Sequence, residues 1–487
     1  MSWRAFVKPQ VLAPPSPSTI AVAVLPFKTL IDEGRDEVLE LGMADSMIAR
    51  LSAARGLVIR PVGSVRRYAA KDADPLRAAR ELGVAWVLDG TVQRSGDRVR
   101  VTARLLNASD GVAAWSGSFD EQFTNVFDVQ DAISQRVAAV LVPRLSERER
   151  AGLSMAGTRN AQAFELYAAA RYESQFFKPD SNRRSLALYQ QAIAADPNYA
   201  YAHAGVADLY RRMQFTSNLA PRDAFEPTRQ AAARALELDP DFADAQANVG
   251  WVTYLYEWDW ARAERSFQRA RELNPNSVEA HHGLGHVLVL TTGRAAEGLA
   301  SFQRAREIDP TSPLRNAFEG TVLVMLDQRD QGMARIQRAL GINPDFWVAH
   351  LFLGNAYVLG GQTELGLASL QRAAAMSGGS AWTTGPLGYA LAQSGRAGEA
   401  RRVLEGMTAK SRSAYVSPAA IALVLVGLGE NEQALDWLDK AYQARDTRLV
   451  YLQAEHRWAP LRTEPRFIAL AKKLLLDPSQ PRQQLSC

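Results

Sequence analysis

Residues 353–357 read Leu-Gly-Asn-Ala-Tyr, and the small residue at the second of these positions recurs along the C-terminal half of the chain. Its spacings are 35, 35, 34, 34 and 34 residues, at Gly250, Gly285, Gly320, Gly354, Gly388 and Ala422. A glycine inside a helix costs about 1 kcal/mol relative to alanine, so its repeated use needs a structural reason. The pattern favours close packing of two helices at positions that lack bulk.

Three further positions repeat with the first. A second small residue stands at Ala263, Gly298, Gly332, Gly366, Ala400 and Ala434. Large apolar residues follow at Phe267, Phe302, Ile336, Leu370, Leu404 and Leu438. Prolines at Pro240, Pro275, Pro310 and Pro344 end the second helix, because the residue before a proline is pushed out of helical space. Each unit is therefore predicted to be a helix pair, and neighbouring pairs stack to bury a continuous core.

This pattern resembles the tetratricopeptide repeat, whose first helix carries Leu-Gly-x-x-Tyr and whose second helix carries Ala, Phe, Ala and Pro. The resemblance covers residues 161–446, where we count about eight helix pairs and expect an elongated right-handed superhelix. A longer interval from Pro197 to Pro240 predicts a loop insertion at residues 215–227. Residues 447–487 are expected to form a capping helix and a tail. A generic α-solenoid and the RNA-binding pentatricopeptide repeat are the alternatives, and the small-residue pair favours the tetratricopeptide type.

Residues 20–145 mix strand and helix patterns and predict a small α/β domain. The apolar run at residues 20–27 predicts a buried strand. Three strand-like runs at residues 85–92, 98–106 and 112–119 are joined by Ser95-Gly96-Asp97 and Ser109-Asp110-Gly111, which are hairpin turn residues. The fold class is thus multidomain, with an α/β domain followed by an all-α superhelix. Residues 1–19, which are rich in proline, and residues 146–160 are expected to be linkers.

Several segments of the predicted α/β domain carry a family resemblance. They are the strand at residues 20–27, Glu81-Leu82-Gly83-Val84, Val87-Leu88-Asp89-Gly90-Thr91-Val92 and Phe127-Asp128-Val129-Gln130. Together they resemble the TolB amino-terminal-like domain of bacterial regulatory proteins. In that family the domain lies between an N-terminal effector and C-terminal tetratricopeptide repeats, and the effector is commonly a winged-helix domain or a class III adenylate cyclase. The resemblance implies a role in bacterial signalling or transcription regulation without naming a partner.

The sequence offers little for catalysis. Nucleophile elbows, phosphate-binding glycine loops, zinc helices and dinucleotide motifs are absent from it. Glu279, His282 and His286 share one helical face, and this spacing could hold a metal; a solvated or peptide-contacting face is the simpler interpretation. We therefore expect neither an enzyme nor a bound cofactor or metal.

We predict that a protein or peptide ligand binds the concave face formed by the first helices of the pairs. Groove positions lie one residue after the small glycine and three before it, and the predicted site comprises Trp251, Tyr254, His282, His286, Thr321, Asn355 and Tyr389. Aromatic residues there can anchor a peptide. Few lysines or arginines fall at these positions, so a clamp for carboxylates is not expected. The alternative is that Trp251 and Tyr389 only pack between repeats.

Composition limits the remaining classes. The net charge is +4 with 56 Lys and Arg residues, and these are interleaved with acidic residues rather than gathered on one face. The single cysteine, Cys487, rules out an internal disulfide framework. The apolar run at residues 421–428 is far shorter than the ~20 residues of a membrane helix. We expect a cytoplasmic scaffold or sensory module; the alternative is the regulatory half of a winged-helix regulator or cyclase whose effector domain is absent from this chain.

A first prediction concerns DNA. Because the sequence shows no recognition helix with a basic face, the purified chain should show no sequence-selective binding in a gel-shift assay at physiological salt. Tight binding to one DNA sequence that survives an excess of unrelated duplex would contradict this expectation.

Overall fold

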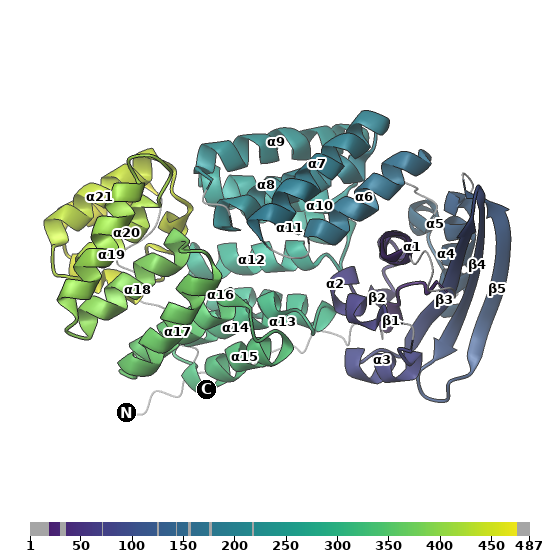
Figure 1. Cartoon of the computed structure of the whole chain (residues 1–487), viewed down its shortest axis with the longest axis horizontal. Coiled ribbons are helices and arrows are strands. Elements are labelled where there is room, and N and C mark those ends of the chain that lie inside the picture. The colour runs from purple at the N-terminus through teal and green to yellow at the C-terminus, as the bar shows by residue number, and fades with distance from the viewer. Residues whose placement is uncertain are drawn as a thin grey trace, which may run out of the picture.

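The computed structural model describes residues 19–29, 36–70, 72–123, 126–142, 144–153, 157–174, 178–216 and 219–474. It shows an α/β domain followed by a long run of paired helices that form a superhelix (Figure 1). Almost all of the predicted N-terminal linker and the last 13 residues of the predicted tail lie outside the described residues. Every helix in the described part of the chain is too short or too polar to cross a bilayer.

The α/β domain is built on a five-stranded sheet of order β2-β1-β3-β4-β5. Its strands are β1 (Ile20–Val24), β2 (Leu57–Ile59), β3 (Trp86–Ser95), β4 (Arg98–Asn107) and β5 (Ala113–Gln122). β1 is parallel to β2 and β3, whereas β3, β4 and β5 form the predicted antiparallel meander. Gly96 and Gly111 have φ angles of 58° and 73° in the two hairpin turns, which explains why glycine stands there.

Five helices complete this domain in the described residues. They are α1 (Glu37–Leu51), α2 (Val62–Val65), α3 (Pro75–Leu82), α4 (Val126–Leu141) and α5 (Glu147–Leu153). Met43 and Met47 of α1 and Ile133 of α4 are completely buried in the core of this domain. The helix α5 lies in the predicted linker at residues 146–160, and Leu153 packs into the same core. That segment is therefore part of the domain rather than a free connection.

Sixteen helices follow in the described part of the array, as eight antiparallel pairs. They are α6 (Ala161–Ser174), α7 (Pro179–Ala195), α8 (Ala200–Thr216), α9 (Pro221–Leu238), α10 (Ala243–Val252), α11 (Trp260–Leu273), α12 (Val278–Leu290), α13 (Ala295–Ile308), α14 (Pro313–Met325), α15 (Arg329–Ile342), α16 (Trp347–Leu359), α17 (Thr363–Met376), α18 (Ala381–Gln393), α19 (Ala397–Lys410), α20 (Pro418–Gly427) and α21 (Asn431–Gln443). The predicted loop insertion at residues 215–227 is wrong, because α9 begins at Pro221 and contains Pro227. The extra length lies in α8 and α9, which have 17 and 18 residues.

The repeated glycines mark the places where the two helices of a pair touch. A Cβ atom on Gly354 would lie 3.0 Å from the carbonyl oxygen of Gly366, and a Cβ on Gly366 would lie 3.0 Å from that of Gly354. Gly320 and Gly332 approach more closely, with corresponding distances of 2.6 Å. The predicted contact of Gly285 with Gly298 is also present at 3.0 Å. The close packing inferred from the sequence is therefore confirmed.

The end of the array folds back onto its earlier repeats, so the expectation of an elongated superhelix is wrong. After α21 come the 3₁₀ helices η4 (Thr447–Tyr451) and η5 (His456–Leu461) and the helix α22 (Pro465–Lys473). The indole nitrogen of Trp260 donates to the carbonyl oxygen of Leu474 at 2.8 Å, and the rings of Trp258 and Tyr442 lie 5.4 Å apart. One hydrophobic cluster joins α9–α12 to α18–α22.

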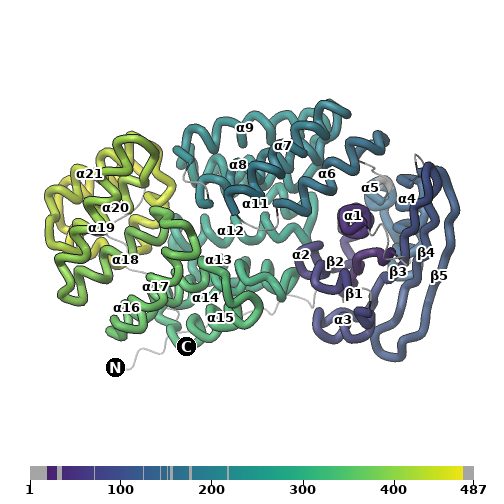
Figure 2. Tube along the Cα trace, in the orientation of Figure 1, coloured from purple at the N-terminus to yellow at the C-terminus, as the bar shows by residue number. Residues whose placement is uncertain are grey.

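The α/β domain docks on the same array (Figure 2). Arg60 donates to the carbonyl oxygen of Ile308 at 3.1 Å, and Ser64 donates to Asp309 at 2.5 Å. Asp45 of α1 pairs with Arg171 of α6 at 3.1 Å. The domain is thereby tied both to the first helix of the array and to the end of α13.

The glycine contacts give a stability prediction. Gly354→Leu should lower the free energy of unfolding by ~1–3 kcal/mol, because the new side chain meets Leu370 and the backbone of Gly366. Gly406→Leu is the matched control: it is an exposed helical glycine with nothing within 4 Å of an added Cβ, so better helix propensity should raise stability by up to ~1 kcal/mol. Equal urea midpoints for the two variants would contradict the packing scheme.

Candidate functional site

The inner face of the array is formed by the first helices of the pairs and is partly covered by residues 447–461, which we call the closing segment. Leu449, Val450 and Leu461 of this segment are buried and hold it to the array. Its polar side chains point the other way, toward the inner face: Arg448 lies 4.3 Å from the ring centroid of Trp382, and Arg457 donates to Asn355 at 3.2 Å. The inner face is therefore a closed chamber at one end rather than an open groove.

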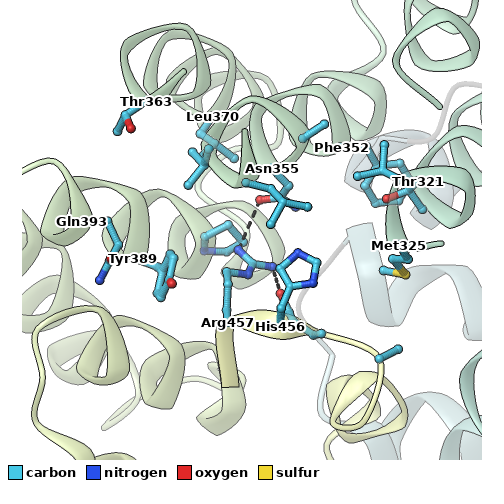
Figure 3. Close-up of a pocket in the computed structure, with 17 residues that line it drawn as sticks. Thr321, Met325, Phe352, Asn355, Thr363, Leu370, Tyr389, Gln393, His456 and Arg457 are labelled. Carbon is cyan, nitrogen blue, oxygen red and sulfur yellow. Dashed lines mark hydrogen bonds and ion pairs between the residues drawn. The ribbon is translucent and has the colours of Figure 1, made fainter. Parts of the chain in front are cut away.

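Two neighbouring cavities occupy this chamber. The deep cavity, of about 170 Å³, is lined by α8, α10, α12, α14, α16, α18 and the closing segment. The outer cavity, of about 390 Å³, lies between α14, α16, α18 and the closing segment (Figure 3). Thr321, Asn355 and Arg457 line both cavities, so the two adjoin.

The structure divides the seven predicted groove residues into two groups. Trp251, Tyr254, His282 and His286 are at most 4% exposed. Three of these line the deep cavity, whereas Tyr254 packs behind it, with its ring 6.1 Å from those of Trp251 and His286. Thr321, Asn355 and Tyr389 are partly exposed and line the outer cavity. The predicted positions do face inward, but four of them are inaccessible to a large partner.

The deep end is shaped by an interruption in the third pair. After α10 the chain forms a π-helical turn at Thr253–Glu257, and Trp258 then adopts a left-handed conformation with φ 61°. π-Bulges are found frequently at functional sites. The turn follows Trp251 directly, and the Trp251 ring lies 5.4 Å from that of His286.

His282 and His286 are neutral in this environment. Burial lowers the pKa of His286 to about 3, and burial also lowers that of His282 well below its usual value; the charge of Arg315 adds to both shifts. Their rings lie 4.8 Å apart. Both ring nitrogens of His286 and Nδ1 of His282 are buried without a hydrogen-bond partner among the described residues. An unmet buried hydrogen-bonding group costs ~1–3 kcal/mol, so these nitrogens mark a site that a ligand could complete.

Arginines converge on the same cavity, which the sequence interpretation missed. Arg211 of α8 and Arg315 of α14 are each 8% exposed and both bind Glu279 of α12. Burial opposes the charge of Arg211, but Glu279 and Asp208 raise its pKa. Few cations stand at the predicted groove positions, so the sequence did not reveal this pair. These arginines stand six residues after Gly205 and five before Gly320, outside the groove positions used for the prediction.

Glu279 is the anionic centre of this arrangement. Burial opposes its ionisation, but Arg315 and Arg211 keep its pKa below the usual value. Its Oε2 also accepts a hydrogen bond from the Trp251 indole at 3.1 Å. Among the described residues, no group of three His, Cys, Asp or Glu side chains is placed to hold a metal ion. Glu279 is engaged with cations instead.

The positive charges of Arg448 and Arg457 in the closing segment are less well balanced by nearby carboxylates. Burial lowers the pKa of Arg448 to about 10. Burial, with the charge of Arg448, lowers the pKa of Arg457 to about 9. Arg457 pairs with Glu455, whereas Arg448 donates to the carbonyl oxygen of Trp382 at 3.3 Å and leaves Nη1 without a partner among the residues described.

Comparison with protein families gives two matches. Residues 18–136 match the model described as the HilA/YgeH-like transcriptional regulator, second domain. Residues 253–313 match the tetratricopeptide repeat. The array is thus of the tetratricopeptide type in its central part. The N-terminal match names a regulator domain different from the TolB amino-terminal-like domain suggested by the sequence.

The individual proteins that this chain resembles are only distantly similar to it in sequence. A protein of Rhizobium meliloti (strain 1021) named adenylate cyclase 3 is 28% identical over 207 residues, which is 42% of this chain and 35% of that protein. The chain thus matches about a third of that relative's length. Human IFIT1 solved with m7Gppp-AAAA has a TM-score of 0.43 at 13% identity, over 66% of this chain and 77% of that one. A tetratricopeptide protein of Thermus thermophilus has a TM-score of 0.33 at 16% identity, over 40% of this chain and 99% of that one.

The buried histidines give a pH prediction. The folded-state pKa of His286 lies below the unfolded value of ~6.5, so the unfolded chain alone takes up this proton as the pH falls below ~6.5. Stability is therefore lost between about pH 6.5 and 3, by up to ~1.4 kcal/mol per pH unit for each such histidine. His286→Gln should make the pH dependence of the urea-unfolding free energy shallower by about that slope between pH 6 and 4.

His203→Gln, which removes an imidazole on α8 outside both cavities, is the control for this measurement. If His286→Gln keeps the wild-type pH dependence of the unfolding free energy, the imidazole of His286 is not held neutral.

Proposed function

We propose that this chain is a non-catalytic regulatory module of bacterial signalling whose array binds a protein or peptide partner at the outer cavity of its inner face. The tetratricopeptide match and the regulator-domain match support the class. The proposed position of the partner site depends on one observation: Thr321, Asn355 and Tyr389 are partly exposed around one cavity of about 390 Å³. Aromatic side chains in such positions are the usual anchors of a bound segment.

The outer cavity offers both apolar and polar contacts. Tyr389 lies beside Arg457, whose guanidinium is 5.7 Å from the ring centroid, and Asn355 accepts a hydrogen bond from the same arginine (Figure 3). Leu370 and Phe352 complete the apolar wall. In this proposal a partner segment inserts an apolar side chain beside Tyr389 and reaches Asn355 and Arg457 with polar groups.

A second candidate concerns the larger protein to which such a chain could belong. The match to the second domain of a transcriptional regulator and the partial match to a protein named as an adenylate cyclase favour a regulatory half that acts on an effector domain. In that case the partner is the effector itself.

A cytoplasmic location is part of both proposals, because a chain with one cysteine does not depend on an oxidising compartment.

Site-specific photo-crosslinking in the native bacterium tests the partner site. Benzoylphenylalanine at position 389 should give a crosslink to a defined protein, whereas the same residue at position 365 should not. Leu365 is the control because it is 53% exposed on α17 and belongs to neither cavity. Once the partner is purified, Tyr389→Ala should weaken its affinity by about ten-fold, or ~1.4 kcal/mol.

The crosslinked peptides also separate the two candidates, since an effector domain with a DNA-binding or cyclase sequence would favour the second. Equal crosslinking from positions 389 and 365, or full affinity in Tyr389→Ala, would rule out the outer cavity as the partner site.

A further inference from the structure

The deep cavity carries more cationic than anionic side chains. Five arginines and two glutamates line it: Arg211, Arg212, Arg315, Arg448, Arg457, Glu279 and Glu455. Asp208, which lies outside the wall, pairs with Arg211 and Arg212. Glu279 is shared between Arg211 and Arg315, and Glu455 pairs with Arg457. Because buried charges in proteins are paired or bind a ligand, this excess calls for an anion.

The excess of positive charge is greatest at Arg448. This side chain stacks on Trp382 at 4.3 Å and donates to its carbonyl oxygen, which leaves Nη1 with no hydrogen-bond partner in the described chain. Asp446, two residues earlier, compensates part of this charge without pairing with the guanidinium among the described residues. Its Oδ2 accepts hydrogen bonds from Ser417 at 2.6 Å and from the backbone nitrogen of Ala419 at 3.0 Å, and its Oδ1 accepts one from the backbone nitrogen of Arg448 at 3.0 Å. Arg448 can therefore bind an oxyanion in the cavity.

Other buried nitrogens of the same wall have no partner within the described residues. They are Nε of Arg211, Nε of Arg315, Nδ1 of His282, and Nδ1 and Nε2 of His286. All four residues are at most 8% exposed. A neutral imidazole donates one hydrogen bond and accepts another, so the histidines can meet a hydroxyl or amide beside the anionic group. The cavity thus presents hydrogen-bonding groups that the described part of the protein does not itself satisfy.

The rest of the wall is aromatic. Phe318 lies 5.0 Å from Phe352 and 4.9 Å from His282, and Trp382 lies 6.2 Å from Tyr451. The deep cavity of about 170 Å³ adjoins the outer one of about 390 Å³, and together they approach the size of pockets that hold small molecules. Such a wall suits a flat or apolar body.

We propose that the deep cavity is an effector site for a small molecule that joins an oxyanion, a phosphate or a carboxylate, to an apolar or aromatic body. The oxyanion binds Arg448 with Arg457 nearby, and the body lies among Trp251, Phe318 and Phe352. A macromolecule does not fit this place, because the space behind Tyr451 and Arg457 holds only a small group. This inference goes beyond the partner site at Tyr389 and does not need that site to be correct.

Isothermal titration calorimetry on the full chain tests the proposal with four probes: phenyl phosphate, benzoate, inorganic phosphate and benzyl alcohol. Phenyl phosphate or benzoate should bind, and the tighter of the two tells which oxyanion the site prefers. Benzyl alcohol, which has the ring without the charge, and inorganic phosphate, which has the charge without the ring, should each bind about ten-fold or more weakly.

Arg448→Gln should weaken the better probe by about ten-fold or more, whereas Arg372→Gln, at an exposed arginine of α17, should leave it unchanged. If Arg448→Gln does not fold by circular dichroism, Arg457→Gln provides the same comparison from the other side of the cavity. The proposal is overturned if neither phenyl phosphate nor benzoate binds, if benzyl alcohol binds equally well, or if a folded Arg448→Gln or Arg457→Gln variant keeps full affinity.

Discussion

The structure depends on how closely the two helices of each pair approach at their small residues. At Gly320 with Gly332 and at Gly354 with Gly366, the backbones come so near that a single added carbon would meet a carbonyl oxygen. Protein interiors are packed as densely as organic crystals, so no space remains between the two helices for a larger side chain. The last repeats come back onto the third pair, where the indole of Trp260 donates to the carbonyl oxygen of Leu474.

The return of the chain changes the nature of the inner face. In an open array, Trp251 and His286 would line a groove; here the closing segment lies across them and brings Arg448 and Arg457 with it. Apolar residues of the segment, such as Leu449 and Leu461, bury themselves in the shared core and hold these cations in place. The cost of burying charge and unmet nitrogens is then offset by the packing around them.

Periodicity and turn chemistry in the sequence were sufficient to predict the repeat and the meander. The 34-residue spacing predicted the helix pairs and the contact of Gly354 with Gly366, and the hairpin turns at Gly96 and Gly111 predicted the meander of the sheet. The same spacing placed Trp251 and Tyr389 on the inner face. Their use as a binding surface stays a prediction.

The rest could not be read from periodicity because it depends on contacts between distant segments. Nothing in residues 447–461 repeats, so the arrival of Arg448 against Trp382 had no local signal. Arg211 and Arg315 lie on separate helices and meet only through Glu279, so no spacing in the sequence joins them. The helix α5 was hidden in a polar stretch for the same reason, since the burial of Leu153 depends on the core of the α/β domain.

The central claim is that the chain closes its own inner face with residues 447–461. Hydrogen–deuterium exchange of the whole chain, read by mass spectrometry, tests it most directly. The backbone nitrogens of Leu452 and Glu455 donate to the carbonyl oxygens of Leu449 and Tyr451 within the segment itself. Because Leu449, Val450 and Leu452 are buried against the array, the peptides of this segment should exchange as slowly as those of α12. Exchange of this segment at the rate of an unstructured peptide, while α12 stays protected, would contradict the account.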